Sequence, residues 1–250
     1  MITRDLHVHT TYSDGKSSPE QVVLSAIEKG LLTLGFSDHS YTPFDSGYTL
    51  KKEKISDYIN EISYLKEKYR DKIEILCGVE QDYYSPPSPN GLDFIIGSVH
   101  YIKIGNEYIL VDNTPAHLRA ATEKYFGGDI YALIEEYYRL AGEVAEKTNA
   151  DIIGHFDLIT KFNEKENLFD QSHPRYIAAW QSAADRLLKA NIPFEINTGA
   201  ISRGYRTTPY PEKSIIEYIK QKGGRFVFSS DSHHADTLAF NFHSLAGYLQ

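Results

Sequence analysis

Short apolar runs rich in β-branched residues recur along the chain, and longer segments with helical apolar spacing separate most of them. This alternation is typical of parallel strands joined by crossover helices. Ser18 and Pro19 fit the cap and first turn of a helix that ends at Gly30, which completes one strand–helix–strand unit. The predicted strands are Asp5–His9, Leu32–His39, Ile73–Glu80, Phe94–Ile102, Asp151–Asp157, Pro193–Thr198 and Phe226–Asp231.

Apolar periodicity also predicts the other helices, which are Lys51–Tyr69, Ile130–Lys147, Pro174–Leu188 and Glu212–Gln221. The longest stretches without a clear period are expected to be irregular, and they are Ser40–Leu50, Tyr83–Asn90 and Lys103–Gly128. None of them has the character of a domain boundary. A length of 250 residues is usual for one α/β barrel, so we expect residues 1–250 to form a single domain.

The composition excludes several classes of protein. Lys+Arg 26 against Asp+Glu 34 gives a formal net charge of -8 without a basic block, so no nucleic-acid partner is expected. The single cysteine, Cys77, excludes an intrachain disulfide framework. We find neither a signal peptide nor an apolar run of about 18 residues. We therefore expect a cytoplasmic protein without a membrane segment that acts on a small molecule.

Residue types that bind metals stand at the carboxyl ends of most predicted strands. His7 and His9 alternate on the first strand, so both imidazoles point to the same side. Asp231 and His233 repeat this spacing at the last strand, which would lie beside the first in a barrel. The candidate ligands are His7, His9, Asp14, His39, Glu80, His100, His155, Asp231 and His233. In a parallel barrel these ends meet at one mouth, where barrel enzymes keep their active sites.

Taken singly, each candidate has a simpler interpretation. Asp14 and Gly15 fit a turn, and His100 and His155 fit hydrogen-bonded core histidines. Taken together, these interpretations are poor, because buried carboxylates and imidazoles are costly unless they are paired or bind a metal. Nine ligands exceed what one zinc ion takes, so two or three ions fit. An imidazole-rich site favours zinc, iron or manganese, and its positive charge suits a phosphate dianion.

The same residues carry a family resemblance. The motifs are His7-Val8-His9-Thr10, Ser13-Asp14-Gly15, Ser37-Asp38-His39, Gly78-Val79-Glu80, Ser98-Val99-His100, Gly154-His155 and Ser230-Asp231-Ser232-His233. In this order they resemble the PHP family, named for polymerase and histidinol phosphatase domains. Glu195-Ile196-Asn197-Thr198, Arg203-Gly204-Tyr205-Arg206 and Pro209-Tyr210-Pro211 are similar to the bacterial histidinol phosphate phosphatase branch.

This resemblance implies a distorted (β/α)7 barrel of the TIM type, with three divalent metal ions at the carboxyl ends of the strands. It also implies hydrolysis of a phosphomonoester. The implied ligand sets are His7, His9, Glu80 and Asp231 for one ion, Glu80, His100 and His155 for the second, and Asp14, His39 and His233 for the third. Only residues 235–250 follow His234, so the segment that closes the barrel is expected to be short.

For the reaction we expect a hydroxide between two ions to attack phosphorus in line. Arg203 and Arg206 are predicted to clamp the phosphate oxygens, with Lys161 as a further candidate, although all three also fit ordinary solvated loop charges. The leaving alkoxide needs a proton, which Asp231 or His39 would supply. The sequence does not choose between these two donors.

Three functions remain open from the sequence. The leading hypothesis is a metal-dependent phosphatase that converts L-histidinol phosphate to L-histidinol and phosphate in histidine biosynthesis. The second is a PHP phosphoesterase that acts on nucleotides or oligonucleotide ends. The third is a metal-binding accessory domain without turnover, against which the full set of ligand residues argues. The sequence makes no prediction of the oligomeric state.

Overall fold

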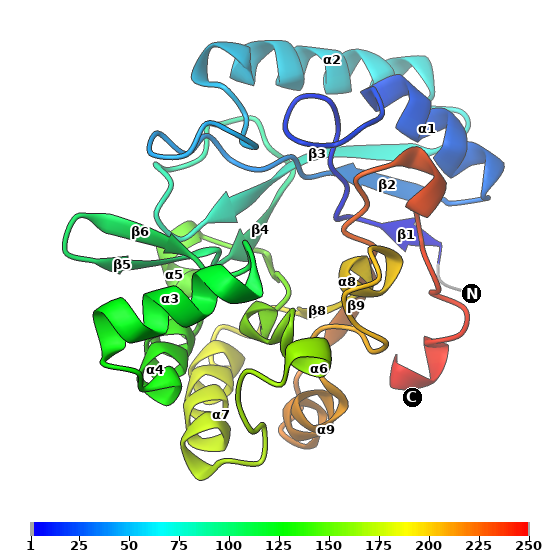
Figure 1. The fold of residues 1–250 in the computed structure, drawn as a ribbon. Helices are drawn as coiled ribbons and strands as arrows, with labels where there is room; N and C mark the ends of the chain where they lie inside the picture. The colour runs from blue at the N-terminus through cyan, green and yellow to red at the C-terminus, as the bar shows by residue number, and fades with distance from the viewer. Residues whose placement is uncertain (1–2, 250) are drawn as a thin grey trace.

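The computed structural model describes residues 3–249 and has a parallel α/β barrel at its centre (Figure 1). Its seven strands pair in the order β1-β2-β3-β4-β7-β8-β9, and every pair is parallel. The strands are β1 (Arg4–Asp5), β2 (Thr33–Phe36), β3 (Glu74–Asp82), β4 (Phe94–Ser98), β7 (Ile152–Ile153), β8 (Phe194–Asn197) and β9 (Phe226–Ser229). The predicted seven-stranded α/β barrel is confirmed.

The first and last strands meet, which nearly closes the barrel. Val8 forms a parallel bridge with Ser232, just beyond the ends of β1 and β9. The buried carboxylate of Asp5 joins the same seam, because it accepts hydrogen bonds from the backbone amides of Ser230 and Ala239 at 3.0 and 2.9 Å. The short segment after His234 therefore takes part in closure.

Strand β3 holds the barrel together in its middle. Its first half pairs with β2 and its second half, from Gly78, pairs with β4. A Cβ atom at Gly78 would lie 2.4 Å from the ring of Phe94, so only glycine allows β4 to approach this closely. This change of partner places Glu80, near the end of β3, inside the barrel mouth.

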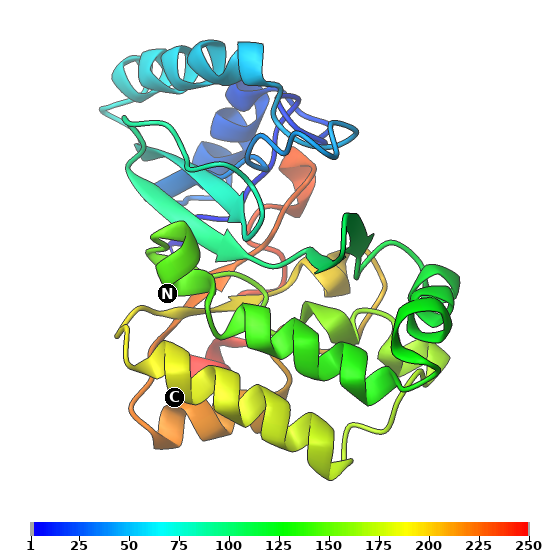
Figure 2. The ribbon, with the colours of Figure 1, turned by 90° about the vertical axis from the view of Figure 1, so that its left-hand side faces the viewer.

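The helices cover the barrel in two groups (Figures 1 and 2). Helices α1 (Pro19–Glu28) and α2 (Ile55–Lys68) lie beside β1 to β3. The larger helices of the other group are α3 (Pro115–Phe126), α4 (Ile130–Ala141), α7 (Pro174–Leu188) and α9 (Lys213–Gln221). The short helices are α5 (Val144–Thr148), α6 (Asn163–Glu166), α8 (Gly199–Ser202) and the 3-10 turns Lys52–Lys54, Leu158–Thr160, Ala235–Thr237 and Ala246–Leu249.

Several sequence predictions differ from the structure. The strand predicted over Phe94–Ile102 is divided between β4 and β5, which belong to different sheets, and the strands predicted over Asp5–His9 and Asp151–Asp157 end early, at Asp5 and Ile153. The segment 103–128, expected to be irregular, contains most of the hairpin β5 (Tyr101–Ile104) and β6 (Glu107–Leu110), and also α3. Thr114 caps α3 and Pro115 occupies its first turn, signals that apolar periodicity does not detect. The helix predicted over Ile130–Lys147 is interrupted after Ala141, where the chain passes close to Ala183 of α7 at Gly142.

Candidate metal centre

A polar cavity of about 310 Å³ opens at the carboxyl ends of the strands. Seven of the nine predicted ligands line it, and the other two, His7 and His9, lie fully buried beneath them. The remaining lining residues are Tyr48, Leu110, Asp112, Asn113, Leu158, Lys161, Arg203 and Tyr205. The topology thus brings side chains from both ends of the chain to one site.

His7 and His9 follow β1 and alternate with Val8, so their rings point inward while Val8 packs in a core cluster with Val22 and Val23 of α1. The centroids of the two imidazoles are 5.1 Å apart. The serine hydroxyl of Ser37 accepts from the amide of Val8 at 2.9 Å and holds this segment against the end of β2. Both imidazoles lie on one side of the chain, although the strand ends at Asp5 and not at His9 as predicted.

Glu80 lies at the centre of the cluster. Its Oε1 atom is 2.8 Å from Nε2 of His155 and 3.4 Å from Nε2 of His100. Its Oε2 atom is 2.8 Å from Nδ1 of His39 and 3.3 Å from Nε2 of His7. Because each oxygen faces a different pair of imidazoles, this carboxylate is suited to bridge two cations.

Asp14 and Asp231 face the other histidines. Oδ1 of Asp14 is 3.7 Å from Nε2 of His39, and its Oδ2 is 3.3 Å from Nε2 of His233. Oδ1 of Asp231 is 3.4 Å from Nε2 of His9 and 3.6 Å from Nδ1 of His233. Asp231 has a positive φ of 50°, an uncommon backbone conformation for aspartate that turns its side chain toward the cluster.

The candidate ligand atoms form four groups, within each of which they lie no more than 4.8 Å apart. These groups are His9, Asp14, His39 and His233; His7, Glu80 and His155; His7, His9 and Asp231; and His39, Glu80 and His100. All nine predicted ligands are therefore brought together.

Buried polar atoms without hydrogen-bond partners show that the cluster fits metal ions. Among the described residues they include Nε2 of His7, both ring nitrogens of His9, Oε2 of Glu80, Nδ1 of His100 and Nδ1 of His155. Leaving such atoms unpaired in the interior is costly, and a cation would satisfy several of them at once. The mixture of imidazole and carboxylate donors suits divalent transition metals. The cluster and its chemistry support divalent metal binding.

The electrostatics of the cluster keep Glu80 and His9 in the forms that bind metals. Burial lowers the pKa values of His7, His39 and His100, but the facing carboxylates outweigh burial and raise them, so these rings lose a proton when a metal binds. Burial raises the pKa of Glu80, but His7 and His39 outweigh burial and hold the pKa well below its usual range, so the carboxylate is ionised. Burial, together with the neighbouring rings of His233 and His39, lowers the pKa of His9 to about 3. His9 is therefore a neutral imidazole at physiological pH, with a lone pair available for a metal.

Three further carboxylates, which were not among the predicted ligands, position the cluster. Glu195 accepts from Nδ1 of His7 at 2.7 Å and from the amide of His155 at 3.0 Å. Asp82 accepts from the amide of His100 at 2.9 Å. A signal was present for Glu195, because a charged residue inside an apolar strand needs a buried partner.

Asp38 is the third of these carboxylates, and it orders the turn that carries Asp14. It accepts hydrogen bonds from the backbone amides and the hydroxyls of Thr10 and Ser13. The turn also needs Gly15, because a Cβ atom there would lie 2.5 Å from the carbonyl oxygen of His9. The local sequence therefore directs Asp14 toward the cluster.

The three predicted phosphate-binding cations lie in different places. Nη2 of Arg203 donates to Oδ2 of Asp231 at 2.9 Å, and Arg203 lines the cavity. Lys161 also lines the cavity and donates to Oδ2 of Asp112 at 2.8 Å. Arg206 does not line the cavity, since its guanidinium is buried against Asp157, 3.4 Å away. The structure brings Arg203 and Lys161 to the candidate site, but not Arg206.

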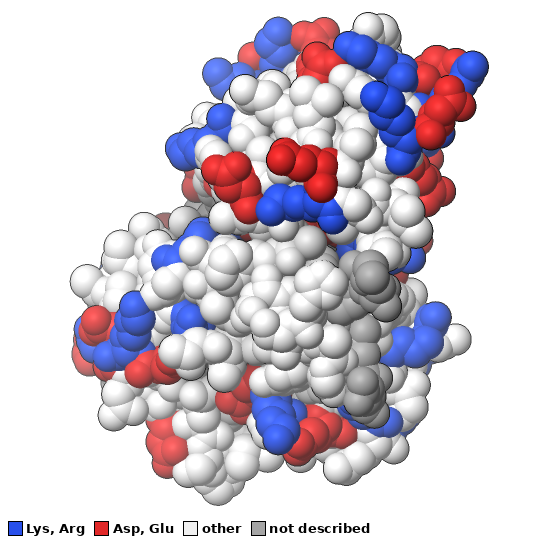
Figure 3. Space-filling view, turned by 90° about the vertical axis from the view of Figure 1, so that its right-hand side faces the viewer, with Lys and Arg blue, Asp and Glu red and all other residues white. Residues whose placement is uncertain are grey.

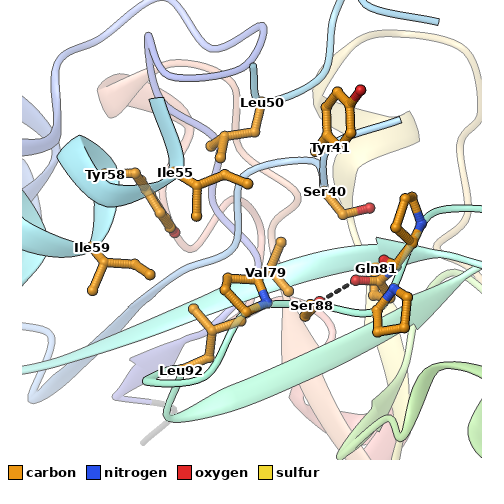
Figure 4. A pocket seen from close by; sticks show the side chains of 13 residues that line it. Ser40, Tyr41, Leu50, Ile55, Tyr58, Ile59, Val79, Gln81, Ser88 and Leu92 are labelled. Atoms are coloured by element: carbon orange, nitrogen blue, oxygen red, sulfur yellow. Dashed lines mark hydrogen bonds between the residues drawn. The ribbon is translucent and has the colours of Figure 1, made fainter. Parts of the chain in front are cut away.

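A second pocket lies on the opposite side of β3 (Figure 4). Val79 and Gln81, which alternate with Glu80 on the strand, point into it together with Leu50, Ile55 and Leu92. Gln81 is hydrogen-bonded there to Ser88. This pocket is mainly apolar, holds about 50 Å³ and contains none of the predicted ligands, so the chemistry lies in the larger cavity.

Within residues 3–249, no helix combines the length and apolar character that crossing a membrane requires.

Comparisons with known proteins find relatives along most of the chain. The family model of the PHP domain matches residues 5–199. Histidinol-phosphatase of Bacillus subtilis is 28% identical over 276 residues, which cover 97% of each chain. A crystal structure of histidinol phosphate phosphatase from Lactococcus lactis, complexed with zinc, L-histidinol and phosphate, has a TM-score of 0.74 at 22% identity and covers 99% of this chain and 92% of that one. A Listeria monocytogenes structure, described as that of a proposed histidinol phosphatase, has a TM-score of 0.81 at 18% identity. The match covers 96% of this chain and 99% of that one.

Proposed function

Because the chain belongs to the PHP domain family, we propose that it is a metal-dependent histidinol-phosphatase, which hydrolyses L-histidinol phosphate to L-histidinol and phosphate. The observation that carries the proposal is the convergence of nine ligand-type side chains around Glu80 in a cavity that also contains two cationic side chains. Similarity over nearly the full length to a histidinol-phosphatase, and a related fold that binds zinc, L-histidinol and phosphate, support the choice of substrate.

We propose three ions for the site, because the number of ligands exceeds what one or two ions need. One observed group consists of His7, His9 and Asp231. Another contains Asp14, His39 and His233. Glu80 would bridge two of the ions, with His100 and His155 beside its Oε1 atom. Zinc, iron and manganese all suit these donors. When bound, such ions lower the pKa of water, so that hydroxide is available at neutral pH, and neutralise phosphate charge.

The side chains of the cavity supply the rest of the chemistry. Arg203, held by Asp231, would place its guanidinium against two phosphate oxygens, and Lys161 would contact a third. Asp231 and His39 both border the cavity, so either would be in a position to protonate the leaving alkoxide. Arg206, paired with Asp157, is proposed instead to support the loop behind the site.

The charge distribution gives no support to a long nucleic acid as substrate. On the face in Figure 3, basic and acidic side chains are interspersed around a largely uncharged area. Together with the net charge of -8, this distribution argues against electrostatic binding of a nucleic-acid backbone. A small phosphomonoester needs no such surface.

The test is a phosphate-release assay on protein loaded in turn with zinc, iron or manganese. L-Histidinol phosphate is compared with a panel of phosphomonoesters, nucleotides and short oligonucleotides. We expect the highest kcat/KM for L-histidinol phosphate and a loss of about 100-fold or more in Asp231→Asn. Asp236→Asn, a nearby exposed aspartate, serves as the matched control. Preference for nucleotides or oligonucleotides would favour the second hypothesis, and no release from any substrate would favour an accessory domain.

A further inference from the structure

Asn197 ends β8 and is fully buried beside the metal centre, although it belongs to none of the candidate ligand groups. Its backbone amide donates to the carbonyl of Tyr210 at 2.7 Å, and its carbonyl accepts from the amide of Tyr210 at 2.9 Å. These two bonds hold the main chain at this position without the side chain. The hydrogen bonds of the Asn197 side chain are therefore not needed to keep the strand in place.

The side-chain amide of Asn197 has a donor end and an acceptor end, and each end has its own partner. Nδ2 donates to Oε2 of Glu195 at 3.1 Å, and Oδ1 accepts from the amide of Gly199 at 2.9 Å. Because a carboxylate accepts and a backbone amide donates, the two partners fix the direction of the side-chain amide. Glu195 also accepts from Nδ1 of His7 and from the amide of His155. Asn197 thus joins the carboxylate that positions two candidate ligands to the first residue of α8.

Gly199 carries this connection on to Arg203. Its carbonyl accepts from the amide of Arg203 at 3.1 Å, across the single turn of α8. A Cβ atom at Gly199 would lie 2.7 Å from Oδ2 of Asp231 and 2.8 Å from Nη2 of Arg203, the two atoms that form the ion pair. Only a residue without a side chain fits against that pair. A shift of Gly199 would therefore displace the guanidinium that lines the cavity.

We propose that Asn197 is a positioning residue, which sets the place of the Arg203 guanidinium relative to the metal ligands through the backbone of Gly199. The inference rests on the proposed function, because it takes Arg203 to bind the phosphate group. Glu195 anchors the donor end of the Asn197 amide, and the acceptor end holds the turn into α8. A misplacement of about 1 Å at such a site can cost about 100-fold in rate, so two hydrogen bonds are enough to matter.

The experiment measures the binding of inorganic phosphate to the zinc-loaded protein by calorimetry, which needs no turnover. Asn197→Ala removes both hydrogen bonds of the side-chain amide and should weaken phosphate binding by about 10- to 100-fold. Asn197→Ser keeps a hydroxyl that accepts from the amide two residues on, more weakly than asparagine does, so a smaller loss is expected. If Asn197→Ala does not fold, Asn197→Ser replaces it.

Two double-mutant cycles separate a role through Arg203 from a general loss of structure. In the Arg203→Met background the guanidinium is absent, so Asn197→Ala should change phosphate affinity by no more than about twofold. In the Lys161→Met background the loss should persist in full, because Lys161 also lines the cavity but donates its hydrogen bonds to Asp112. An equal loss in all three backgrounds, or no loss in the wild-type background, would overturn the proposal.

Zinc content separates the proposed route from an effect on the metal ions. Glu195 keeps His7 and His155 as donors in Asn197→Ala, so the zinc content of this variant should match that of the wild type. A loss of zinc that accounts for the weaker phosphate binding would overturn the route through Gly199.

The same measurements also separate this inference from the proposed function. If phosphate binding and both cycles behave as expected, but L-histidinol phosphate is not preferred over other phosphomonoesters, the function is wrong and the positioning role stands. If L-histidinol phosphate is preferred, but Asn197→Ala leaves phosphate affinity unchanged, the positioning role is wrong. A zinc-loaded wild type that binds no phosphate would likewise overturn the positioning role.

Discussion

The ring of His7 donates from Nδ1 to Oε1 of Glu195 across 2.7 Å, and both side chains are fully buried. This contact leaves Nε2 of His7 to face Glu80 and Asp231. Oε2 of Glu195 accepts from the amide of His155 and from the side-chain amide of Asn197. One carboxylate therefore sets the ring orientation of one candidate ligand and the backbone position of another.

Glu195→Gln should lower zinc affinity and kcat by about 10- to 100-fold, because an amide cannot accept from donors on both sides. Zinc affinity is measured by competition with a chromophoric chelator, independently of turnover. Asp5→Asn is the matched control, since Asp5 is equally buried and accepts from backbone amides in the same barrel. The control should melt earlier yet keep its zinc affinity. Unchanged zinc affinity in Glu195→Gln would refute the positioning role.

Removal of metal should inactivate and destabilise the protein. Buried ring nitrogens of His7 and His9 and one oxygen of Glu80 form no hydrogen bonds with the described residues. A ligand that binds only the folded state at 100 times its Kd adds about 2.7 kcal/mol to the free energy of unfolding. Thermal unfolding after chelation, and again after zinc is restored, measures this difference. A melting temperature that changes neither on chelation nor on return of zinc would contradict a metal-binding cluster.

Arg203→Met should mainly lower catalytic efficiency, whereas Arg206→Met should mainly lower the stability of the fold. Arg203 lines the cavity, so its loss should lower kcat/KM by about 100-fold with little change in melting temperature. Arg206 is buried against Asp157, and its loss leaves that buried carboxylate without a cation, at a cost of about 3 to 5 kcal/mol in unfolding free energy. Steady-state kinetics and denaturant unfolding of both variants provide the check. The reverse pattern would restore Arg206 as the phosphate clamp.

Cys77 should resist alkylation in the folded protein. Burial, with a smaller effect from Asp93, raises the pKa of its thiol to about 12. The folded thiol therefore stays protonated at pH 8, and the reactive species is the thiolate. The stability that the protonated thiol of Cys77 gives the fold is present below the ordinary thiol pKa. It is lost as the pH rises above that value toward the pKa of the folded state. Iodoacetamide labelling at pH 8 should be at least about 100-fold slower than in denaturant, and equal rates would exclude a buried thiol.

The barrel and the convergence of the nine candidate ligands could be predicted because each rests on a local pattern. Predicted strand runs that end in His9, His39, Glu80 or Asp231 indicate both the element and the end at which the candidate ligands lie. Arg203 and Arg206 could not be separated in this way, since both occur in one loop and only the tertiary partner Asp157 distinguishes them. The hairpin of β5 and β6 was missed because the segment lacks a sustained apolar period.

The seam between Val8 and Ser232 also determines when the barrel closes during synthesis. His7 and His9 leave the ribosome before Asp231 and His233. Until the later residues emerge, the edge of β1 that β9 covers remains open, a state prone to pair with other chains. A polypeptide released before Asp231 would lack both the seam and a metal ligand, so barrel closure and catalytic competence would arrive together.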